Sequence, residues 1–244
     1  MPHFFIQSEQ VENDKIKISK GETFTHLKSA LRVNIGEKVL FIDEKYIQYE
    51  TVVELIEKDF LIASVQNKYP SKRFIKHNLY LAQSVLKTDA QFYAIQKASE
   101  LGVKAIYPLI TDNCAVKQKV AEQKIPHWQK ISYEASKQCE RPDVAQIMPL
   151  NNFDFVLNNK EFEHILFFTE RNSNTTLKEL AAKKEIKPTD KILVVIGPEG
   201  GFSENEFAKM EKYAVNKLSL GNLILRADTA VTAALATVLY ELGY

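Results

Sequence analysis

Several features that would assign a chain to a specialised class are scarce in this sequence. Its 244 residues include only two cysteines, Cys114 and Cys139, which cannot form a disulfide framework or a cysteine-based zinc site. Such usage fits a reducing compartment, so we expect a cytoplasmic protein. The first residues lack a basic stretch followed by an apolar run, which predicts no secretory signal. No apolar run approaches the roughly 18–20 residues that cross a bilayer, so we expect no membrane segment.

Charge of one sign is not in excess either. The 32 Lys and Arg residues stand against 31 Asp and Glu, which leaves a net charge of +1. The chain therefore lacks the strongly basic composition of many nucleic-acid-binding domains, although segregated charge could still bind nucleic acid. With 45% hydrophobic and 26% charged residues, the composition is that of an ordinary globular protein.

Residues 1 to about 68 have the pattern of a small β domain. Short segments alternate polar with apolar residues or are rich in β-branched and aromatic ones, as half-buried strands are. We expect strands at 4–6, 15–18, 38–42, 48–53 and 59–65, and a helix at 23–31 with Leu27 and Leu31 on one face. So many short strands in so few residues predict a small barrel. The polar, basic segment 67–76, which contains Pro70, is the predicted linker.

Strands alternate with helices in the rest of the chain. We expect strands at 79–85, 103–110, 165–168, 191–196 and 217–220, and helices at 88–102, 125–140, 176–184, 203–213 and 228–242. The pairs Thr88/Gln91 and Ser203/Glu206 have the spacing of a capping box. This alternation predicts a mostly parallel sheet with helices on both faces.

The segment 191–206 carries the clearest functional signal. An unbroken apolar strand leads into GPEGG at 197–201, and a helix follows. Ligands of open α/β sheets bind at the carboxyl ends of strands, where glycines let the backbone approach them. A tight turn with a helix cap explains Ser203 and Glu206, but it does not explain three glycines with a proline and a carboxylate. Neither the Walker A nor the dinucleotide glycine motif occurs. Glu199 would repel phosphate, so a weakly charged or cationic ligand fits better.

A second segment, LGNLILRADTA at 220–230, follows the last predicted strand. Its loop 222–225 is unusually apolar, and core packing is the simplest alternative role for Leu223 and Leu225. Asp228 suits a helix start, either as a cap or as a favoured acid. Arg226 opposes the helix dipole there, so it pairs with Asp228 or Glu199 or meets an anionic substrate.

Together, GPEGGFSENE and LGNLILRADTA resemble the RsmE family, the bacterial 16S ribosomal RNA (uracil-N3)-methyltransferases of the knotted SPOUT superfamily. The resemblance covers the whole chain. MPHFF at the start, with residues 26–37, is similar to the family's PUA-like barrel, QKASELGV at 96–103 to its QKATELGV stretch, and residues 134–141 to its A-x-x-Q-x-x-R helix. Two positions differ from the family. Asp228 replaces a glutamate, and Asn113 lies where the family often has an arginine, so a basic RNA contact is missing or moved.

The resemblance implies an α/β SPOUT-type parallel sheet with a C-terminal trefoil knot at residues 74–244. A small PUA-like β-barrel RNA-binding domain at residues 1–70 would precede it. The implied activity is methylation of N3 of a specific uridine in 16S rRNA, on the assembled small subunit, by a homodimer that uses S-adenosyl-L-methionine. The implied cofactor-binding residues are Thr169, Ile196, Gly197, Pro198, Glu199, Gly200, Leu220, Gly221, Asn222 and Leu225.

The implied chemistry needs a group that stabilises a uracil anion, and Arg226 is the candidate. No residue is an evident general base, with Asp228 and Glu199 the candidates. The five histidines have no metal-binding spacing, so no metal is expected. The basic side chains that could contact RNA, each equally well explained as a solvated charge, are Lys72, Arg73, Lys76, His77, Lys87, Lys97, Lys137 and Arg141.

Two functions of other classes stay open. One is an RNA-binding ribosome-assembly factor that has lost catalysis on the same fold. Intact Gly197, Gly200, Gly201 and Arg226 argue against it, because an inactive site need not keep them. The other is a nucleotide- or NAD-dependent small-molecule enzyme, against which the two missing phosphate motifs argue.

Overall fold

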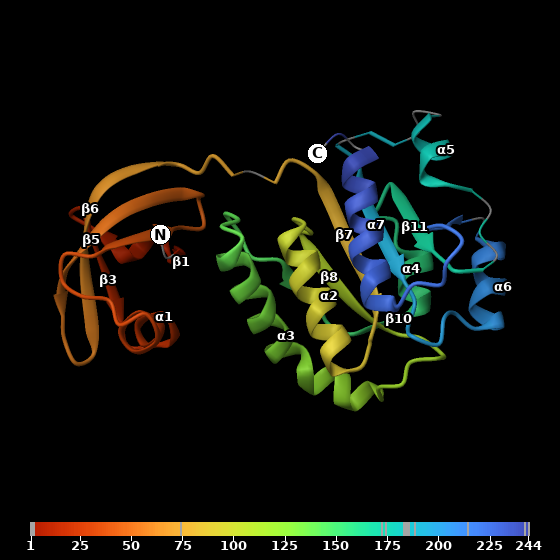
Figure 1. Ribbon diagram of the computed structural model, residues 1–244, viewed down its shortest axis with the longest axis horizontal. Coiled ribbons are helices and arrows are strands. Elements are labelled where there is room, and N and C mark those ends of the chain that lie inside the picture. Colours follow the sequence, from red (N-terminus) through yellow and green to blue (C-terminus); the bar gives the residue numbers. More distant parts are fainter. Residues whose placement is uncertain are drawn as a thin grey trace. The chain divides into compact units, whose positions relative to one another are not determined.

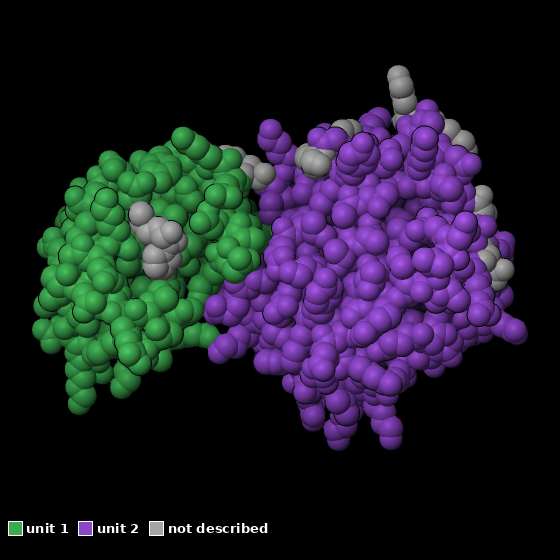
Figure 2. Space-filling model, in the orientation of Figure 1, with its two compact units in different colours: residues 1–74, 137–143 green, residues 75–136, 144–244 purple. Residues whose placement is uncertain are grey.

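The computed structural model describes residues 3–73, 75–171, 173, 175–182, 186–187, 189–213, 215–241 and 243. The chain divides into two compact units (Figure 2). The first comprises residues 1–74 and 137–143, and the second residues 75–136 and 144–244. Met1, Pro2, Lys184, Leu242 and Tyr244, which the sequence analysis used, lie outside the described residues.

The first unit is built on a six-stranded sheet with the order β1-β4-β5-β6-β3-β2 (Figure 1). Its strands are β1 (His3–Phe5), β2 (Val11–Glu12), β3 (Lys15–Ser19), β4 (Lys38–Ile42), β5 (Ile47–Ile56) and β6 (Phe60–Pro70). The β1–β4 pair is parallel and the other pairs are antiparallel. Alternation sets the faces, because Ile16 and Ile18 of β3 are buried while the lysines between them are exposed.

Two details of this unit differ from the sequence prediction. Strand β6 runs to Pro70, so the first residues of the expected linker 67–76 are strand, and the proline lies at the strand's end, where its missing N–H is tolerated. The predicted helix 23–31 is a short α1 (Glu22–Thr25) followed by a π-helical turn, η2 (His26–Ala30). Leu27 is buried but Leu31 is 44% exposed, so the two do not share a buried face. A 3₁₀ turn, η1 (Ser8–Gln10), precedes β2.

The second unit is an α/β structure on an all-parallel sheet, as the alternating pattern predicted. The strand order is β10-β8-β7-β12-β11-β13, with β9 paired to β8. The strands are β7 (Asn78–Ser84), β8 (Ala105–Ile110), β9 (Gln146–Ile147), β10 (Asn151–Asn152), β11 (His164–Phe168), β12 (Lys191–Ile196) and β13 (Asn216–Leu218). All of its pairings are parallel.

Helices cover both faces of this sheet. They are α2 (Thr88–Glu100), α3 (Gln118–Gln138), α4 (Phe153–Asn158), α5 (Leu177–Ala182), α6 (Glu204–Lys212) and α7 (Ala227–Glu241). Ile192, Val194 and Ile196 of β12 pack in one core with residues of α2, α3, α5 and α7. Leu193 and Val195 pack in the opposite core with residues of α4 and α6. Strand β12 is therefore buried on both faces, which explains its unbroken apolar sequence.

Several predictions for this unit were wrong in detail. Thr88 and Gln91 form no capping box, because Lys87 is the N-cap of α2 and the Gln91 side chain accepts from the Leu86 amide at 2.8 Å. Helix α3 begins at Gln118 rather than 125, with Pro126 inside it. The elements β9, β10 and α4 were not predicted. No helix among the described residues combines the length and apolar character that a membrane crossing requires.

Candidate functional site

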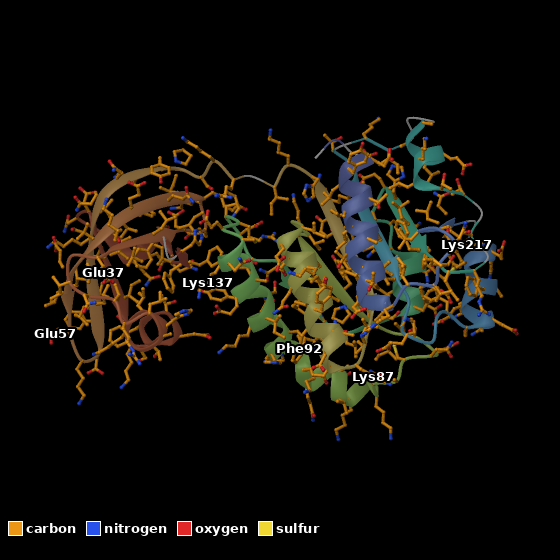
Figure 3. All side chains as sticks on the ribbon, in the orientation of Figure 1. Glu37, Glu57, Lys87, Phe92, Lys137 and Lys217 are labelled. Carbon is orange, nitrogen blue, oxygen red and sulfur yellow. The ribbon has the colours of Figure 1, made fainter. Side chains whose placement is uncertain are left out.

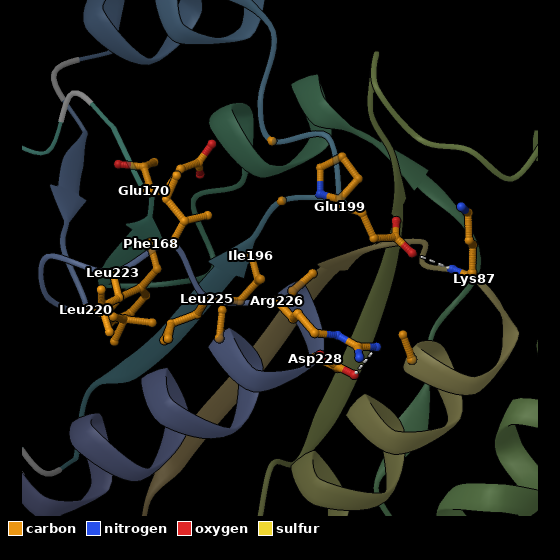
Figure 4. A pocket seen from close by; sticks show the side chains of 18 of the residues that line it. Lys87, Phe168, Glu170, Ile196, Glu199, Leu220, Leu223, Leu225, Arg226 and Asp228 are labelled. Carbon is orange, nitrogen blue, oxygen red and sulfur yellow. Dashed lines mark hydrogen bonds and ion pairs between the residues drawn. The ribbon is translucent and has the colours of Figure 1, made fainter.

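One pocket lies at the carboxyl ends of four neighbouring strands, β7, β12, β11 and β13. Its volume is about 630 Å³, within the usual size range of small-molecule sites. The loops after these strands line it, together with the first turns of α2 and α7 (Figure 4). Parallel pairing aligns these strand ends, with Phe168 of β11 opposite Ile196 of β12, so segments far apart in sequence meet at one edge.

The glycine loop that follows β12, residues 197–201, forms one wall. It closes through a bond from the Gly201 amide to the Pro198 carbonyl at 2.9 Å, with Gly201 at φ 70°. A β-carbon at Gly197 would lie 3.2 Å from the Phe202 ring, and one at Gly200 would lie 3.1 Å from the Asn113 β-carbon. The loop is therefore packed closely from behind, and a side chain at either glycine would push its neighbour by a few tenths of an ångström.

The loop between β8 and α3 supports this wall. Asn113 Nδ2 donates to the carbonyl oxygens of Gly201 at 3.1 Å and Gly200 at 3.4 Å. Ser203 Oγ donates to Asp112 Oδ2 at 2.5 Å. Asn113, which the sequence analysis considered as an altered RNA contact, thus braces the glycine loop.

The start of α6 is tied to the same support. Ser203 and Glu206 form the predicted capping box, which is confirmed. Glu206 Oε1 also accepts from the Asp112 amide at 3.1 Å. Burial raises the pKa of Glu206, while its bonds from the Ser203 and Asp112 amides act in the opposite direction. Glu206 is therefore a structural acid behind the pocket.

Glu199 points toward helix α2 rather than toward Arg226. Its Oε1 accepts from the Lys87 amide at 2.9 Å, at the N-terminus of that helix (Figure 4). A carboxylate is favoured there, because the first amides of a helix lack partners and carry partial positive charge. Of the two partners considered for Arg226, the structure therefore selects Asp228.

Arg226 and Asp228 form an ion pair at the start of α7. Arg226 Nη2 lies 3.3 Å from Asp228 Oδ2, with the arginine side chain 80% and the aspartate 15% exposed. Asp228 lies in the first turn and is not the N-cap, since α7 begins at Ala227; its Oδ1 also accepts from the Thr229 amide at 2.9 Å. The guanidinium is thus held on one side and open to the pocket on the other.

The apolar loop after β13 lines the opposite wall. Leu223 is 80% and Ile224 69% exposed, so core packing does not explain Leu223. In Figure 4, Phe168, Leu220 and Leu223 gather on one side of the pocket, while the Glu199–Lys87 and Arg226–Asp228 pairs lie on the other. One side of the pocket thus combines large apolar side chains with the Glu170 carboxylate, and the other carries the Glu199–Lys87 and Arg226–Asp228 contacts.

The structure brings most of the predicted site residues together. Those that line the pocket are Thr169, Ile196, Gly197, Pro198, Glu199, Leu220, Gly221, Leu225 and Arg226. Gly200 and Asn222 belong to the same two loops but do not line it. The sequence analysis missed Glu170, Lys87 and Asp89 as lining residues. Glu170 could have been found, because it lies only two residues after a predicted strand end.

Some of the basic side chains considered for RNA contacts are already engaged. Arg141 is 4% exposed and pairs with Asp143, and Arg73 pairs with Glu140. Lys137, labelled in Figure 3, lies 3.1 Å from His26 Nδ1. Lys97 pairs with Glu100. Within the described ranges, no group of three or more His, Cys, Asp or Glu side chains could hold a metal ion.

Comparisons with known proteins identify the family. A family model for the RNA methyltransferase domain matches residues 75–239. Ribosomal RNA small subunit methyltransferase E of Bacillus subtilis (strain 168) is 27% identical, over 99% of this chain and 97% of that protein. The protein of the same name from Mesomycoplasma hyopneumoniae (strain 232) is 30% identical, over 94% of this chain and 95% of that protein.

Solved structures are similar in fold to this protein over almost the whole chain. The ribosomal RNA small subunit methyltransferase E of Neisseria gonorrhoeae, bound to S-adenosylmethionine, superposes with a TM-score of 0.83 at 26% identity, covering 98% of this chain and 97% of that one. The structure of a methyltransferase from Legionella pneumophila with the bound cofactor SAM superposes with a TM-score of 0.87 at 27% identity, with the same coverage of both chains. The chain belongs to the ribosomal RNA small subunit methyltransferase E family and carries its RNA methyltransferase domain.

Proposed function

We propose that this chain transfers the methyl group of S-adenosylmethionine to N3 of a specific uridine in 16S rRNA, on the assembled small subunit. Methylation of rRNA with this cofactor is the activity of the family, and the chain is an rRNA methyltransferase. The observation that carries the proposal is the meeting of the glycine loop, the apolar loop and Arg226 in one pocket of the RNA methyltransferase domain.

The pocket suits S-adenosylmethionine in size and charge. Among the described residues, its lining includes the carboxylates of Asp89, Glu170, Glu199 and Asp228 and two basic residues, Lys87 and Arg226. Such a balance favours a ligand with a sulfonium and an ammonium group over one with phosphates. Thr169 Oγ1 is buried and makes no hydrogen bond within the described chain, so it is available to a ligand. We assign cofactor binding to the predicted residues that line this pocket.

Arg226 is proposed to act on the uracil ring. When bound, S-adenosylmethionine supplies an electrophilic methyl group for the acceptor nitrogen. N3 of uridine carries a proton, and negative charge spreads to O2 and O4 as that proton leaves. The open face of the Arg226 guanidinium would stabilise this charge, with Asp228 holding it from behind. Neither candidate base is assigned that role, because Glu199 accepts from the Lys87 amide and Asp228 is paired with Arg226.

We extend the proposal to the arrangement of the whole chain. The second unit would form a SPOUT-type trefoil knot through the loops after β12 and β13. The first unit would be a PUA-like RNA-binding barrel. A homodimer would cover the exposed side chains of Leu223, Ile224 and Tyr240, because large exposed apolar groups favour an interface. An enzyme that acts in rRNA processing would work in the cytoplasm.

The test uses purified protein, labelled S-adenosylmethionine and small subunits from a strain that lacks this methylation. Digestion and mass spectrometry of the RNA should give N3-methyluridine at one site, with much less product from Arg226→Ala. Naked 16S rRNA, tested in parallel, should be a poorer substrate. Cofactor binding without transfer would refute this target. Neither binding nor transfer would favour the alternative function as an inactive assembly factor.

A further inference from the structure

Glu170 is a carboxylate of the pocket lining that has no partner among the described residues. It lies two residues beyond the end of β11 and is exposed. Within the described part of the chain it makes no hydrogen bond or ion pair. Glu199 and Asp228 are engaged by the Lys87 amide and by Arg226, and Asp89 lies in the first turn of α2, where the helix dipole favours an acid. Glu170 has no comparable stabilising partner in the part of the chain that the structure describes.

The position of Glu170 places it beside the glycine loop. Strands β11 and β12 are neighbours, so the segment after Phe168 runs along the segment after Ile196. A β-carbon at Gly201 would lie 2.6 Å from Glu170 Oε1. Figure 4 shows Glu170 on the side of Phe168 and Leu220, away from Arg226. A ligand that lies on the glycine loop and against the apolar wall therefore has this carboxylate within reach.

The donor that fits best is a vicinal diol. A carboxylate has two oxygens that accept side by side, and a ribose presents its 2′ and 3′ hydroxyls with matching spacing. In dinucleotide-binding α/β folds, an acid near the glycine-rich strand holds a ribose hydroxyl in this way. We propose that Glu170 accepts hydrogen bonds from the ribose hydroxyls of the bound cofactor and so selects a ribonucleoside. This inference rests on the proposed function, since it presumes that the pocket binds S-adenosylmethionine.

The α-ammonium group of the same cofactor could also donate to Glu170. Ligands that carry only one of the two groups show whether Glu170 binds the ribose hydroxyls or the ammonium group. S-adenosylhomocysteine carries both the ribose and the amino acid, whereas 5′-methylthioadenosine keeps the ribose and lacks the amino acid. The 2′-deoxy form of S-adenosylhomocysteine removes one hydroxyl alone. Affinities for all three are measured by calorimetry with the wild type, Glu170→Ala and Glu170→Gln. Glu204→Gln, the same change at an exposed acid outside the pocket lining, is the matched control.

We expect Glu170→Ala to lower the affinities for S-adenosylhomocysteine and 5′-methylthioadenosine by the same factor. That factor should be about tenfold to a hundredfold, as for the loss of hydrogen bonds to a charged group. The wild type should prefer S-adenosylhomocysteine over its 2′-deoxy form, and Glu170→Ala should lose that preference. The affinities of Glu170→Gln should lie between those of the wild type and Glu170→Ala, and those of Glu204→Gln should equal those of the wild type. Unchanged thermal unfolding of each variant would show that the fold is intact.

Two results would overturn the inference while leaving the proposed function in place. One is a loss of affinity for S-adenosylhomocysteine but not for 5′-methylthioadenosine, which would assign Glu170 to the ammonium group. The other is wild-type affinity of Glu170→Ala for every ligand. A wild-type protein that binds none of the ligands would instead refute the proposed function, and the inference with it.

Discussion

Gly201 and the carboxylate of Glu170 occupy adjoining space, such that a β-carbon at position 201 would lie 2.6 Å from Glu170 Oε1. Gly201 also has a φ of 70°, in the left-handed region that side chains rarely adopt. The backbone therefore favours glycine at this position, and a β-carbon there would also displace the neighbouring carboxylate. The turn of the glycine loop and the position of Glu170 depend on the same residue.

Gly201→Ala should therefore weaken cofactor binding as well as lower stability. The left-handed backbone costs about 1 kcal/mol with a side chain present, and the flexible Glu170 side chain must move away. Gly36→Ala is the matched control, because Gly36 has a φ of 90° with no atom within 4 Å of the added carbon. Both variants should unfold earlier in urea, but only Gly201→Ala should lose affinity for S-adenosylhomocysteine. Equal affinities would refute this coupling.

Asn113→Ala should disturb the pocket from outside it. The change removes two donated bonds to the carbonyls of Gly200 and Gly201, which hold the loop at its turn. We expect a stability loss of about 1 kcal/mol and a severalfold weaker affinity for S-adenosylhomocysteine. Asn151→Ala removes a similar amide bond, to the Pro149 carbonyl, and should lower stability without changing affinity. Wild-type affinity in Asn113→Ala would mean that the loop holds its shape without this brace.

Local patterns predicted the bounds of some elements well. The expected bounds of β4 and β12 match the structure, because both combine apolar residues with clear turn residues at their ends. The capping box at Ser203 was predicted for the same reason, since all of its atoms come from four consecutive residues. Strands β9 and β10 have two residues each, too few for any periodicity, so residues 146–158 were missed.

The site could be predicted only in part, because its parts come from different strands. The loops after β12 and β13 could be identified from the sequence because their compositions are unusual. The role of Lys87 depends on β7 lying beside β12, which strand order determines and local sequence does not. Asn113 reaches the glycine loop through packing of the β8–α3 loop against it, and nothing in its own surroundings in the sequence indicates that contact.

His3 should make the first unit less stable in mild acid. Burial is the main cause that lowers its pKa from 6.5 to about 4, Lys137 and Arg73 act in the same direction, and Glu140 opposes them. Between pH 6.5 and 4, His3 is therefore protonated in the unfolded chain but neutral in the folded unit. Stability from this residue is complete above pH 6.5 and falls as the pH drops, by at most about 3 kcal/mol.

His3→Phe tests this, since it cannot titrate but keeps a ring beside Phe5. Urea unfolding of the full chain at several pH values should show a smaller loss of stability in His3→Phe than in the wild type between pH 6.5 and 4. Because all other titrating groups are shared, the difference between the two proteins isolates His3. Parallel curves would show that His3 titrates alike in the folded and unfolded chain.

Asp228 should act on catalysis through Arg226 rather than as a base. Asp228→Asn keeps the size of the side chain but removes the charge that holds the guanidinium. In the wild type, Asp228 Oδ2 lies 3.3 Å from Arg226 Nη2. We expect cofactor affinity to be unchanged and kcat on small subunits to fall about tenfold. Asp228→Glu should restore most of the activity, because a glutamate can still reach the arginine.

The double variant Arg226→Ala/Asp228→Asn separates positioning from base catalysis. If Asp228 works through Arg226, the double variant should be no slower than Arg226→Ala alone, since the group being positioned is already missing. The pH profile of kcat should keep its shape in Asp228→Asn. If Asp228 were the base, the two losses would multiply and the acidic limb of the profile would disappear. In that case, Asp228 would have to release Arg226 before it could reach the uracil proton, because one of its oxygens faces the guanidinium and the other accepts from the Thr229 amide.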